Sequence, residues 1–146
     1  MSPMNELHTA AFADLDATTL YALLRLRVNI FVVEQECAYP ELDGRDTAPG
    51  TTHLWLERDG EPVAYLRILD EDGTARIGRV CVAKPARGGG QAARLMGAAL
   101  QYIGQRPCVL DAQSYLVGFY TGLGFRPAGP EYVEDGIAHT PMVRGG

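Results

Sequence analysis

The stretch that decides the fold reads VCVAKPARGGGQAARLMGAAL and covers residues 80–100. It begins with an apolar, β-branched run and ends in an alanine-rich segment, and three consecutive glycines, Gly88–Gly90, separate the two. Because β-branched residues favour strands and alanine favours helices, the stretch predicts a strand, a tight turn and a helix. A simple connection needs one glycine at most. Three glycines beside Arg87 therefore indicate a turn whose backbone lies close to a ligand.

The place of the glycines before the helix indicates what that ligand is. The first turn of a helix has backbone N–H groups without intrahelical partners, and the helix dipole adds partial positive charge there. A turn without Cβ atoms lets a phosphate reach these groups. We expect a pyrophosphate to bind the following backbone amides, with the Arg87 guanidinium nearby: Gly88, Gly89, Gly90, Gln91 and Ala92.

The charge distribution agrees with a local anion site. The chain has a net charge of -5, yet residues 75–110 contain six basic residues and no acidic one. Residues 34–46 show the opposite pattern, with five carboxylates and a single arginine. A broad basic face is absent, and so the sequence predicts no nucleic-acid partner. The acidic residues predict a negatively charged entrance for a cationic acceptor.

Length and composition indicate one domain over residues 1–146, with 47% hydrophobic and 21% charged residues. We expect no membrane contact, because no apolar run is long enough to span a bilayer. The first residues lack the features of a secretory signal. Three cysteines without CxxC spacing argue against both disulfides and a zinc site. The expected location is the cytoplasm, and no metal is expected.

Hydrophobic periodicity predicts a mixed α/β fold, that is, α+β rather than a doubly wound sheet. A first helix is expected over residues 17–30, with Asp16 or Thr18 as its N-cap. Three strands follow, joined by hairpin turns at Asp59-Gly60 and Asp72-Gly73. After the helix that follows the glycines come a short strand, CVLDAQ, a short helix, SYLVGFYTGLGF, and one or two strands in the tail.

Two other phosphate-binding classes fit the glycines less well. A nucleotide P-loop requires Lys-Ser or Lys-Thr after its last glycine, and this chain has neither there. A dinucleotide site fits in a relaxed form, with Gly88, Gly90 and Ala93 in the turn and Asp111 downstream. However, hairpin-joined strands precede the turn, whereas a dinucleotide fold would surround it with parallel βαβ units. This class remains as a minor alternative.

Residues 87–92, RGGGQA, match the pattern [Q/R]-x-x-G-x-[G/A] between a strand and a helix. This resembles the acyl-CoA signature of the GNAT N-acetyltransferase superfamily, and residues 120–125, YTGLGF, resemble its later Y-x-x-x-GF segment. Further blocks, LRVNIFVVEQECAYPELDGRD, AYLRIL, RIGRVCV, AQSYLVGFY and EDGIAHTPM, resemble the ElaA-like branch. The resemblance implies a central, mostly antiparallel sheet with a splayed strand pair, flanked by helices.

The resemblance also implies roles for residues around the turn. Acetyl-CoA would be the co-substrate, and its pantetheine would pair with main-chain groups of Val80, Cys81 and Val82, where the family's strands splay. Gln113 takes the position of a polar contact to the pantetheine, although it can equally be a helix cap. Tyr120 matches the tyrosine that acts as general acid, because a phenol is protonated at neutral pH and can donate to a thiolate.

The general base is less well indicated. Some relatives place a glutamate on the strand before the loop, but here that strand, RIGRVCVA, has no carboxylate. The remaining candidates are Glu34, Asp43, Asp46, His53, Asp135 and His139. We favour Glu34 and His139, acting directly or through water; a weakly basic amine would need no base.

The sequence thus predicts an acyl-CoA-dependent enzyme that transfers an acetyl group to a primary amine of a small molecule or peptide by direct attack. The resemblance further suggests a homodimer. The alternative is a module that binds acyl-CoA without turnover, as a sensor or for protein interaction. A ping-pong route through cysteine is disfavoured, because Cys81 and Cys108 lie in expected buried strands without a neighbouring base.

Overall fold

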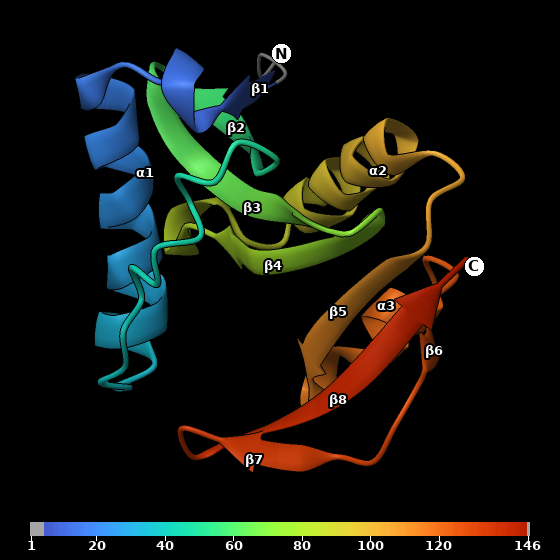
Figure 1. Cartoon of the computed structure of the whole chain (residues 1–146). Helices are drawn as coiled ribbons and strands as arrows, with labels where there is room; N and C mark the ends of the chain where they lie inside the picture. Colours follow the sequence, from blue (N-terminus) through green and yellow to red (C-terminus); the bar gives the residue numbers. More distant parts are fainter. Residues whose placement is uncertain (1–4, 146) are drawn as a thin grey trace.

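The computed structural model describes residues 5–145, which build one mixed, eight-stranded sheet flanked by helices (Figure 1). The main strand order is β1-β2-β3-β4-β5-β8-β6, and β7 pairs with β8 outside this path. Every pair is antiparallel except β4 and β5. The predicted fold class, a mostly antiparallel sheet with flanking helices, is therefore confirmed.

The N-terminal part begins with an edge strand that the hydrophobic pattern does not predict. Strand β1 (Glu6–Ala11) pairs antiparallel with β2 over six residues. Helix α1 (Ala17–Val28) follows, and the Asp16 carboxylate caps it by accepting a hydrogen bond of 2.7 Å from the Thr19 amide. The helix continues into a π-helical segment, η2 (Asn29–Glu34), which places Glu34 at its end.

The predicted three-stranded meander is present as β2 (Thr52–Arg58), β3 (Glu61–Glu71) and β4 (Thr74–Val82). In both predicted turns the Asp and the Gly have positive φ, as a two-residue type I′ turn requires. Helix α2 (Gln91–Ile103) follows the glycines, and β5 (Cys108–Gln113) and α3 (Val117–Thr121) come next. The tail forms β6 (Arg126–Pro127), β7 (Tyr132–Glu134) and β8 (Ile137–Arg144).

The sheet opens between β4 and β5. These parallel strands have only two registered pairs, Ala75 with Cys108 and Arg76 with Val109, and beyond Arg76 no pairing with β5 continues. In the same region β4 departs from regular pairing with β3, and Arg79 takes a positive φ of 57°. A bulge of this kind bends a strand and increases its twist. The splayed pair therefore leaves the β5-facing edge of β4 open.

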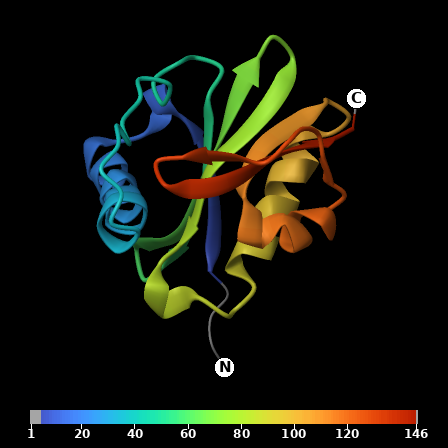
Figure 2. The same ribbon diagram turned by 90° about the horizontal axis from the view of Figure 1, so that it is seen from below.

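Helices α1 and α2 lie on opposite sides of the sheet (Figure 2), and apolar side chains pack on both of its faces. On one face Leu95, Met96 and Ala99 of α2 pack against β2, β3 and β4, in the core that also contains Tyr120 and Phe125. On the other face α1 covers a second cluster: Leu23, Ile30, Trp55, Tyr65 and Cys81. These two cores hold the ends of α1 and α2 on either side of the opening in the sheet.

Candidate active site

A cavity of about 880 Å³ lies at the opening of the sheet. Its walls come from η2, the segment after it, β4, the start of α2, β5, α3 and the β7–β8 hairpin. The volume is within the usual range for a small-molecule or cofactor site. Of the predicted site residues, all but Gly89 line this cavity: Glu34, Val80, Cys81, Val82, Arg87, Gly88, Gly90, Gln91, Ala92, Gln113, Tyr120 and His139.

The glycine turn has the geometry of an anion cradle. Gly88 and Gly90 have φ of 85° and 77°, a region that other residues rarely adopt. The first hydrogen bond that closes a turn of α2 runs from the Arg94 amide to the Gly90 carbonyl, at 3.0 Å. The amides of residues 91–93 precede that bond and belong to the first turn, which has no intrahelical acceptors. The residues present therefore fit a pyrophosphate at the cavity wall.

Arg87 makes contacts that the sequence did not reveal. Its Nη1 and Nη2 donate to the two carboxylate oxygens of Glu34 at 2.6 and 2.7 Å, and its Nε donates to the Val82 carbonyl at 2.9 Å. The hydrogen bond from Arg87 holds the pKa of Glu34 below its ordinary value. A carboxylate held in this way is a weak base, so the geometry argues against Glu34 as the group that deprotonates the acceptor.

The splayed edge of β4 and the end of β5 face each other across the cavity. Val80, Cys81 and Val82 contribute this part of β4, and Gln113 ends β5. The Cys81 side chain packs into the α1-side core, and burial raises the pKa of its thiol to about 12. Only main-chain groups of Cys81 are therefore suited to a ligand.

Tyr120 reaches the cavity from α3 and is 6% exposed. Its ring packs edge-on against Phe119 and Phe125, with centroids 5.1 and 6.1 Å away. Its hydroxyl has no hydrogen-bond acceptor within residues 5–145, and burial raises its pKa to about 12. The phenol is therefore protonated at neutral pH and free to donate a hydrogen bond to a ligand.

His139 lies on β8 beside the end of β5, in register with Gln113 and with Tyr132 of β7. Its ring stacks on Tyr132 at 5.6 Å, and its Nδ1 lies 2.8 Å from the Ile137 carbonyl. A carbonyl only accepts, so Nδ1 carries the proton and Nε2 of the neutral ring has a free lone pair. This arrangement suits a base that takes a proton at Nε2.

Among the other candidate bases, His53 and Asp43 are held by hydrogen bonds to neighbouring residues. His53 is buried, with Nδ1 2.6 Å from the Tyr65 hydroxyl and Nε2 3.0 Å from the Asp46 carbonyl. Burial lowers the pKa of His53. Hydrogen bonds from Arg67 hold the pKa of Asp43 well below its usual range. Asp135 lines the cavity at the β7–β8 turn and forms no ion pair within residues 5–145.

A buried ion network occupies the acidic segment. Three arginines, Arg27, Arg67 and Arg79, meet three carboxylates, Glu41, Asp43 and Asp46, so the formal charges cancel. Arg27 is 1% exposed and lies 2.6 Å from Glu41 and 2.8 Å from Asp46. Arg67 lies 3.1 Å from Asp46.

The sequence does not reveal this network, and from the sequence these carboxylates are expected to form part of a negatively charged entrance. That expectation is wrong for Glu41, Asp43 and Asp46, because three arginines neutralise them. Arg27 and Arg67 stand within the apolar runs LLRLRV and AYLRIL, a position that already suggests buried cations in need of partners. The network fastens residues 41–46 to α1 and the sheet.

The chain resembles known proteins over almost its whole length. The model of the acetyltransferase (GNAT) domain matches residues 28–144. The UPF0039 protein Rv2851c of Mycobacterium tuberculosis is 51% identical over 138 residues, which cover 91% of this chain and 88% of the relative. The protein ElaA of Escherichia coli is 40% identical over 139 residues, 90% of this chain and 91% of the relative.

Two solved structures share the fold. A Pseudomonas aeruginosa protein described as an acyl-CoA N-acyltransferase has a TM-score of 0.93 and 42% identity, and the match covers 97% of this chain and 99% of that one. The structure of Escherichia coli ElaA has a TM-score of 0.92 and 38% identity, with the same coverage. The chain therefore belongs to the GNAT acetyltransferase family, whose members are acyl-CoA-dependent N-acyltransferases.

Proposed function

We propose that the protein transfers an acetyl group from acetyl-CoA to a primary amine by direct attack. One observation carries this proposal: a single cavity contains the glycine turn before α2, the splayed edge of β4, the Tyr120 side chain and His139. A pyrophosphate site, a strand edge for pantetheine, a hydrogen-bond donor and a proton acceptor thus border the same space.

In the proposed reaction the amine nitrogen attacks the thioester carbonyl carbon, a C–N bond forms and the C–S bond breaks. The amine proton passes to Nε2 of His139, directly or through a water molecule. Tyr120 donates a hydrogen bond to the sulfur as negative charge develops on it, and the departing CoA thiolate takes its proton from the solvent. The imidazolium releases its proton to the solvent, which offsets the proton taken up by the thiolate, and an acceptor that enters as an ammonium ion releases one further proton to the solvent before it attacks.

The environment of Tyr120 suits this role. Burial raises the pKa of its hydroxyl to about 12, so the group is a hydrogen-bond donor throughout the neutral range. A donor in a site of low polarity stabilises a developing anion more strongly than the same donor in water. The raised pKa also makes the phenol a weaker acid. We therefore expect Tyr120 to act mainly through a hydrogen bond that stabilises the thiolate.

A direct route agrees with the state of the cysteines. Cys37, Cys81 and Cys108 are all buried and reduced. Burial raises the pKa of the Cys108 thiol to about 11, and that of Cys81 to about 12. Because the thiolate is the nucleophile, neither group is suited to form an acyl-cysteine intermediate.

The acceptor is proposed to be an amine of a small molecule or peptide. Asp135 and Glu134 of the β7–β8 hairpin line the cavity and form no ion pair within residues 5–145. Their charges favour an acceptor that arrives as a cation and loses a proton inside the cavity. Because arginines neutralise Glu41, Asp43 and Asp46, this hairpin supports a cationic acceptor better than residues 41–46 do.

Thiol release and binding, measured together, test the proposal. The protein is incubated with acetyl-CoA and a panel of amines that includes polyamines, amino sugars and peptides, and free CoA is followed with a thiol reagent. A parallel thermal-shift titration with acetyl-CoA reports binding. We expect a rise in Tm and amine-dependent thiol release. Binding without release for any amine would favour the non-catalytic sensor, and no shift at saturating acetyl-CoA would reject both functions.

A further inference from the structure

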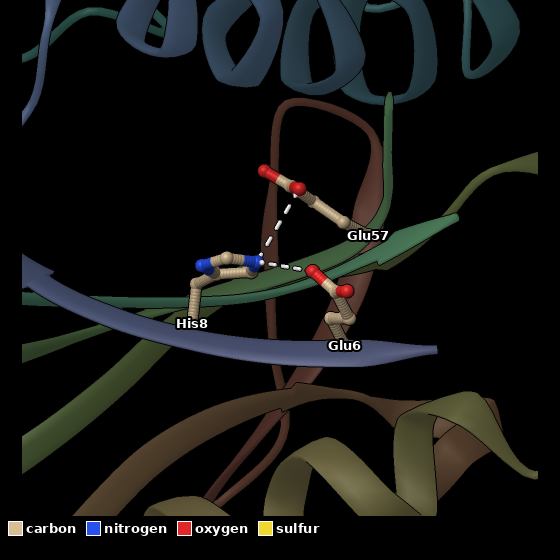
Figure 3. A group of neighbouring side chains, drawn as sticks. All are labelled: Glu6, His8 and Glu57. Carbon is tan, nitrogen blue, oxygen red and sulfur yellow. Dashed lines mark ion pairs between the residues drawn. The ribbon is translucent and has the colours of Figure 1, made fainter. Parts of the chain in front are cut away.

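A second cluster of polar side chains lies outside the acyl-CoA cavity, at the edge of the sheet. Glu6 and His8 of β1 and Glu57 of β2 each offer one ligand atom, and these atoms all lie within 4.8 Å of one another. Figure 3 shows the two carboxylates turned toward the same ring nitrogen of His8. No residue of this cluster lines the acyl-CoA cavity.

The distances match those of a shared metal ion. Nε2 of His8 lies 3.4 Å from Glu6 Oε2 and 3.3 Å from Glu57 Oε2. Two ligands bound tetrahedrally to zinc at about 2.0–2.1 Å are separated by about 3.3–3.4 Å. Each carboxylate oxygen is thus already at the spacing from Nε2 that a common Zn²⁺ would require.

The surroundings of the His8 ring also favour a role as a metal ligand. Nε2 of His8 is buried and makes no hydrogen bond within residues 5–145, although two carboxylate oxygens lie close to it. The aromatic ring is held in place, because it stacks on Trp55 with centroids 5.3 Å apart and planes 11° apart. A fixed imidazole whose nitrogen lies at ion-pair distance from two carboxylates, without a hydrogen bond to either, has the form of a ligand set.

The second carboxylate is also oriented by the protein. The indole N–H of Trp55 donates to Glu57 Oε1 at 3.1 Å, and Oε2 of the same carboxylate faces His8. Trp55 is 5% exposed, so one buried side chain positions two of the three candidate ligands. Outer contacts of this kind fix the orientation of metal ligands.

The strand pairing supplies an independent argument. Glu6 and Glu57 are direct register partners on neighbouring antiparallel strands. Like charges placed opposite each other destabilise a strand pair, and a cation between them removes this repulsion. Among the described strands, β1 is an edge strand that pairs with β2 alone. A metal ion with ligands from both strands would fasten it.

We propose that Glu6, His8 and Glu57 form a binding site for a divalent transition-metal ion of the Zn²⁺ class, with a water molecule in the fourth position. One imidazole nitrogen and two carboxylate oxygens suit zinc better than calcium or magnesium, which take more oxygen ligands. The site fastens β1 to β2 and takes no part in acyl transfer, so it stands independently of the proposed function.

The test uses the untagged full chain, with Zn²⁺ and Co²⁺ as probes. Trp55 is the single tryptophan of the chain and stacks on His8, so its fluorescence reports metal at that ring. We expect saturable binding of one equivalent of Zn²⁺ by calorimetry, a change of tryptophan fluorescence with Co²⁺ and a visible Co²⁺ spectrum of tetrahedral type. Saturating Zn²⁺ should raise Tm by on the order of 5 °C.

Variants locate the site. His8→Gln and Glu57→Gln should each weaken Zn²⁺ binding by at least about tenfold and abolish the Co²⁺ spectrum. The exposed Glu6→Gln is a further ligand variant, and circular dichroism checks that each variant is folded. Trp55→Phe keeps an aromatic ring but removes the indole N–H, and about tenfold weaker binding is expected by calorimetry. Glu61→Gln, an exposed glutamate on β3, serves as the matched control and should bind normally.

Two results would overturn the proposal. Absence of saturable binding would show that His8 and the carboxylates form a surface ion-pair group only. Binding that His8→Gln and Glu57→Gln leave unchanged would place the metal elsewhere on the chain.

Discussion

Arg87 and Glu34 form a two-point ion pair, with N–O distances of 2.6 and 2.7 Å, that ties the glycine turn to the end of η2. The pair brings together segments 53 residues apart in the chain and lies on the wall of the cavity at the opening of the sheet. Both side chains are 38% exposed, so solvent screens the interaction. The pair therefore contributes little to the free energy of unfolding. Its main effect is to fix the position of the Arg87 guanidinium beside the glycine turn.

The pair predicts opposite effects of two substitutions on acetyl-CoA binding. Glu34→Gln removes a negative charge beside the expected pyrophosphate, and KM for acetyl-CoA should fall about threefold with kcat nearly unchanged. Arg87→Ala removes the cation, and KM should rise on the order of tenfold. Steady-state kinetics with varied acetyl-CoA measure both. Arg25→Ala, an exposed arginine on α1, is the control. If Glu34→Gln instead slowed turnover by on the order of a hundredfold at constant KM, Glu34 would be the base.

Tyr120→Phe should separate chemistry from binding. Loss of the hydroxyl removes the donor to the leaving sulfur, so kcat should fall by a factor on the order of 10²–10⁴. Affinity for acetyl-CoA, measured by calorimetry, should stay within about twofold, because the ring still packs against Phe119 and Phe125. Tyr102→Phe, on the exposed side of α2, should leave kcat unchanged. Full turnover of the Tyr120 variant would assign the tyrosine a packing role.

His139→Gln should lower kcat/KM by on the order of 10²-fold for an amine that enters as a cation. The substitution removes the free nitrogen of the ring but leaves the strand pairing with β5 intact. An acceptor amine of low basicity, tested in parallel, should lose less activity, because it needs no base. Equal losses for both amines would contradict a role in deprotonation.

Gly90→Asp should abolish measurable acetyl-CoA binding, since a carboxylate would stand where the pyrophosphate is expected. Gly90→Ala is the matched control. A Cβ at this position meets no atom within 4 Å, so alanine adds only the strain of a positive φ. The alanine variant should therefore bind with affinity closer to that of the native chain. Unchanged affinity in Gly90→Asp would show that the turn is not the phosphate site.

The buried ion network predicts how stability depends on pH. Burial raises the pKa of Asp46, but hydrogen bonds and charges from Arg27 and Arg67 outweigh this and lower the pKa overall. A carboxyl whose pKa is lower in the folded state adds stability above its unfolded value of about 3.9. That stability is lost as the pH falls through the folded-state pKa. Urea unfolding from pH 7 to pH 3 should therefore show a decline that begins near the unfolded pKa.

Asp46→Asn isolates this contribution. The substitution leaves two buried arginines short of a counter-charge and should lower the free energy of unfolding at pH 7 by about 3–5 kcal/mol. The difference from the native chain should narrow as the pH falls, because the native carboxyl is then protonated as well. Glu61→Gln breaks only the exposed pair with Arg25 and should cost less than about 1 kcal/mol. A difference that is constant with pH would contradict the role of the Asp46 charge.

Much of the fold could be predicted from the sequence, because its turns and helix ends are specified by a few neighbouring residues. The Asp59-Gly60 and Asp72-Gly73 turns adopt the positive φ values that their residue types favour, and Asp16, one of the two predicted N-caps, caps α1. Strand β1 was not predicted: its sequence, ELHTAA, has no strong alternation, and its pairing with β2 makes it a strand. An edge strand of this kind is specified by its partner more than by its own residues.

The sequence by itself determined the glycine turn and the strand and helix around it, because these follow from backbone preferences of neighbouring residues. The resemblance of several sequence blocks to a known family indicated the family. Only the tertiary structure decided how the charges are used. It pairs Glu34 with Arg87, neutralises Glu41, Asp43 and Asp46 with three arginines, and leaves Nε2 of His139 without a hydrogen-bond partner among residues 5–145. Such pairings depend on distances between residues far apart in the chain, and a pattern of neighbouring residues does not contain those distances.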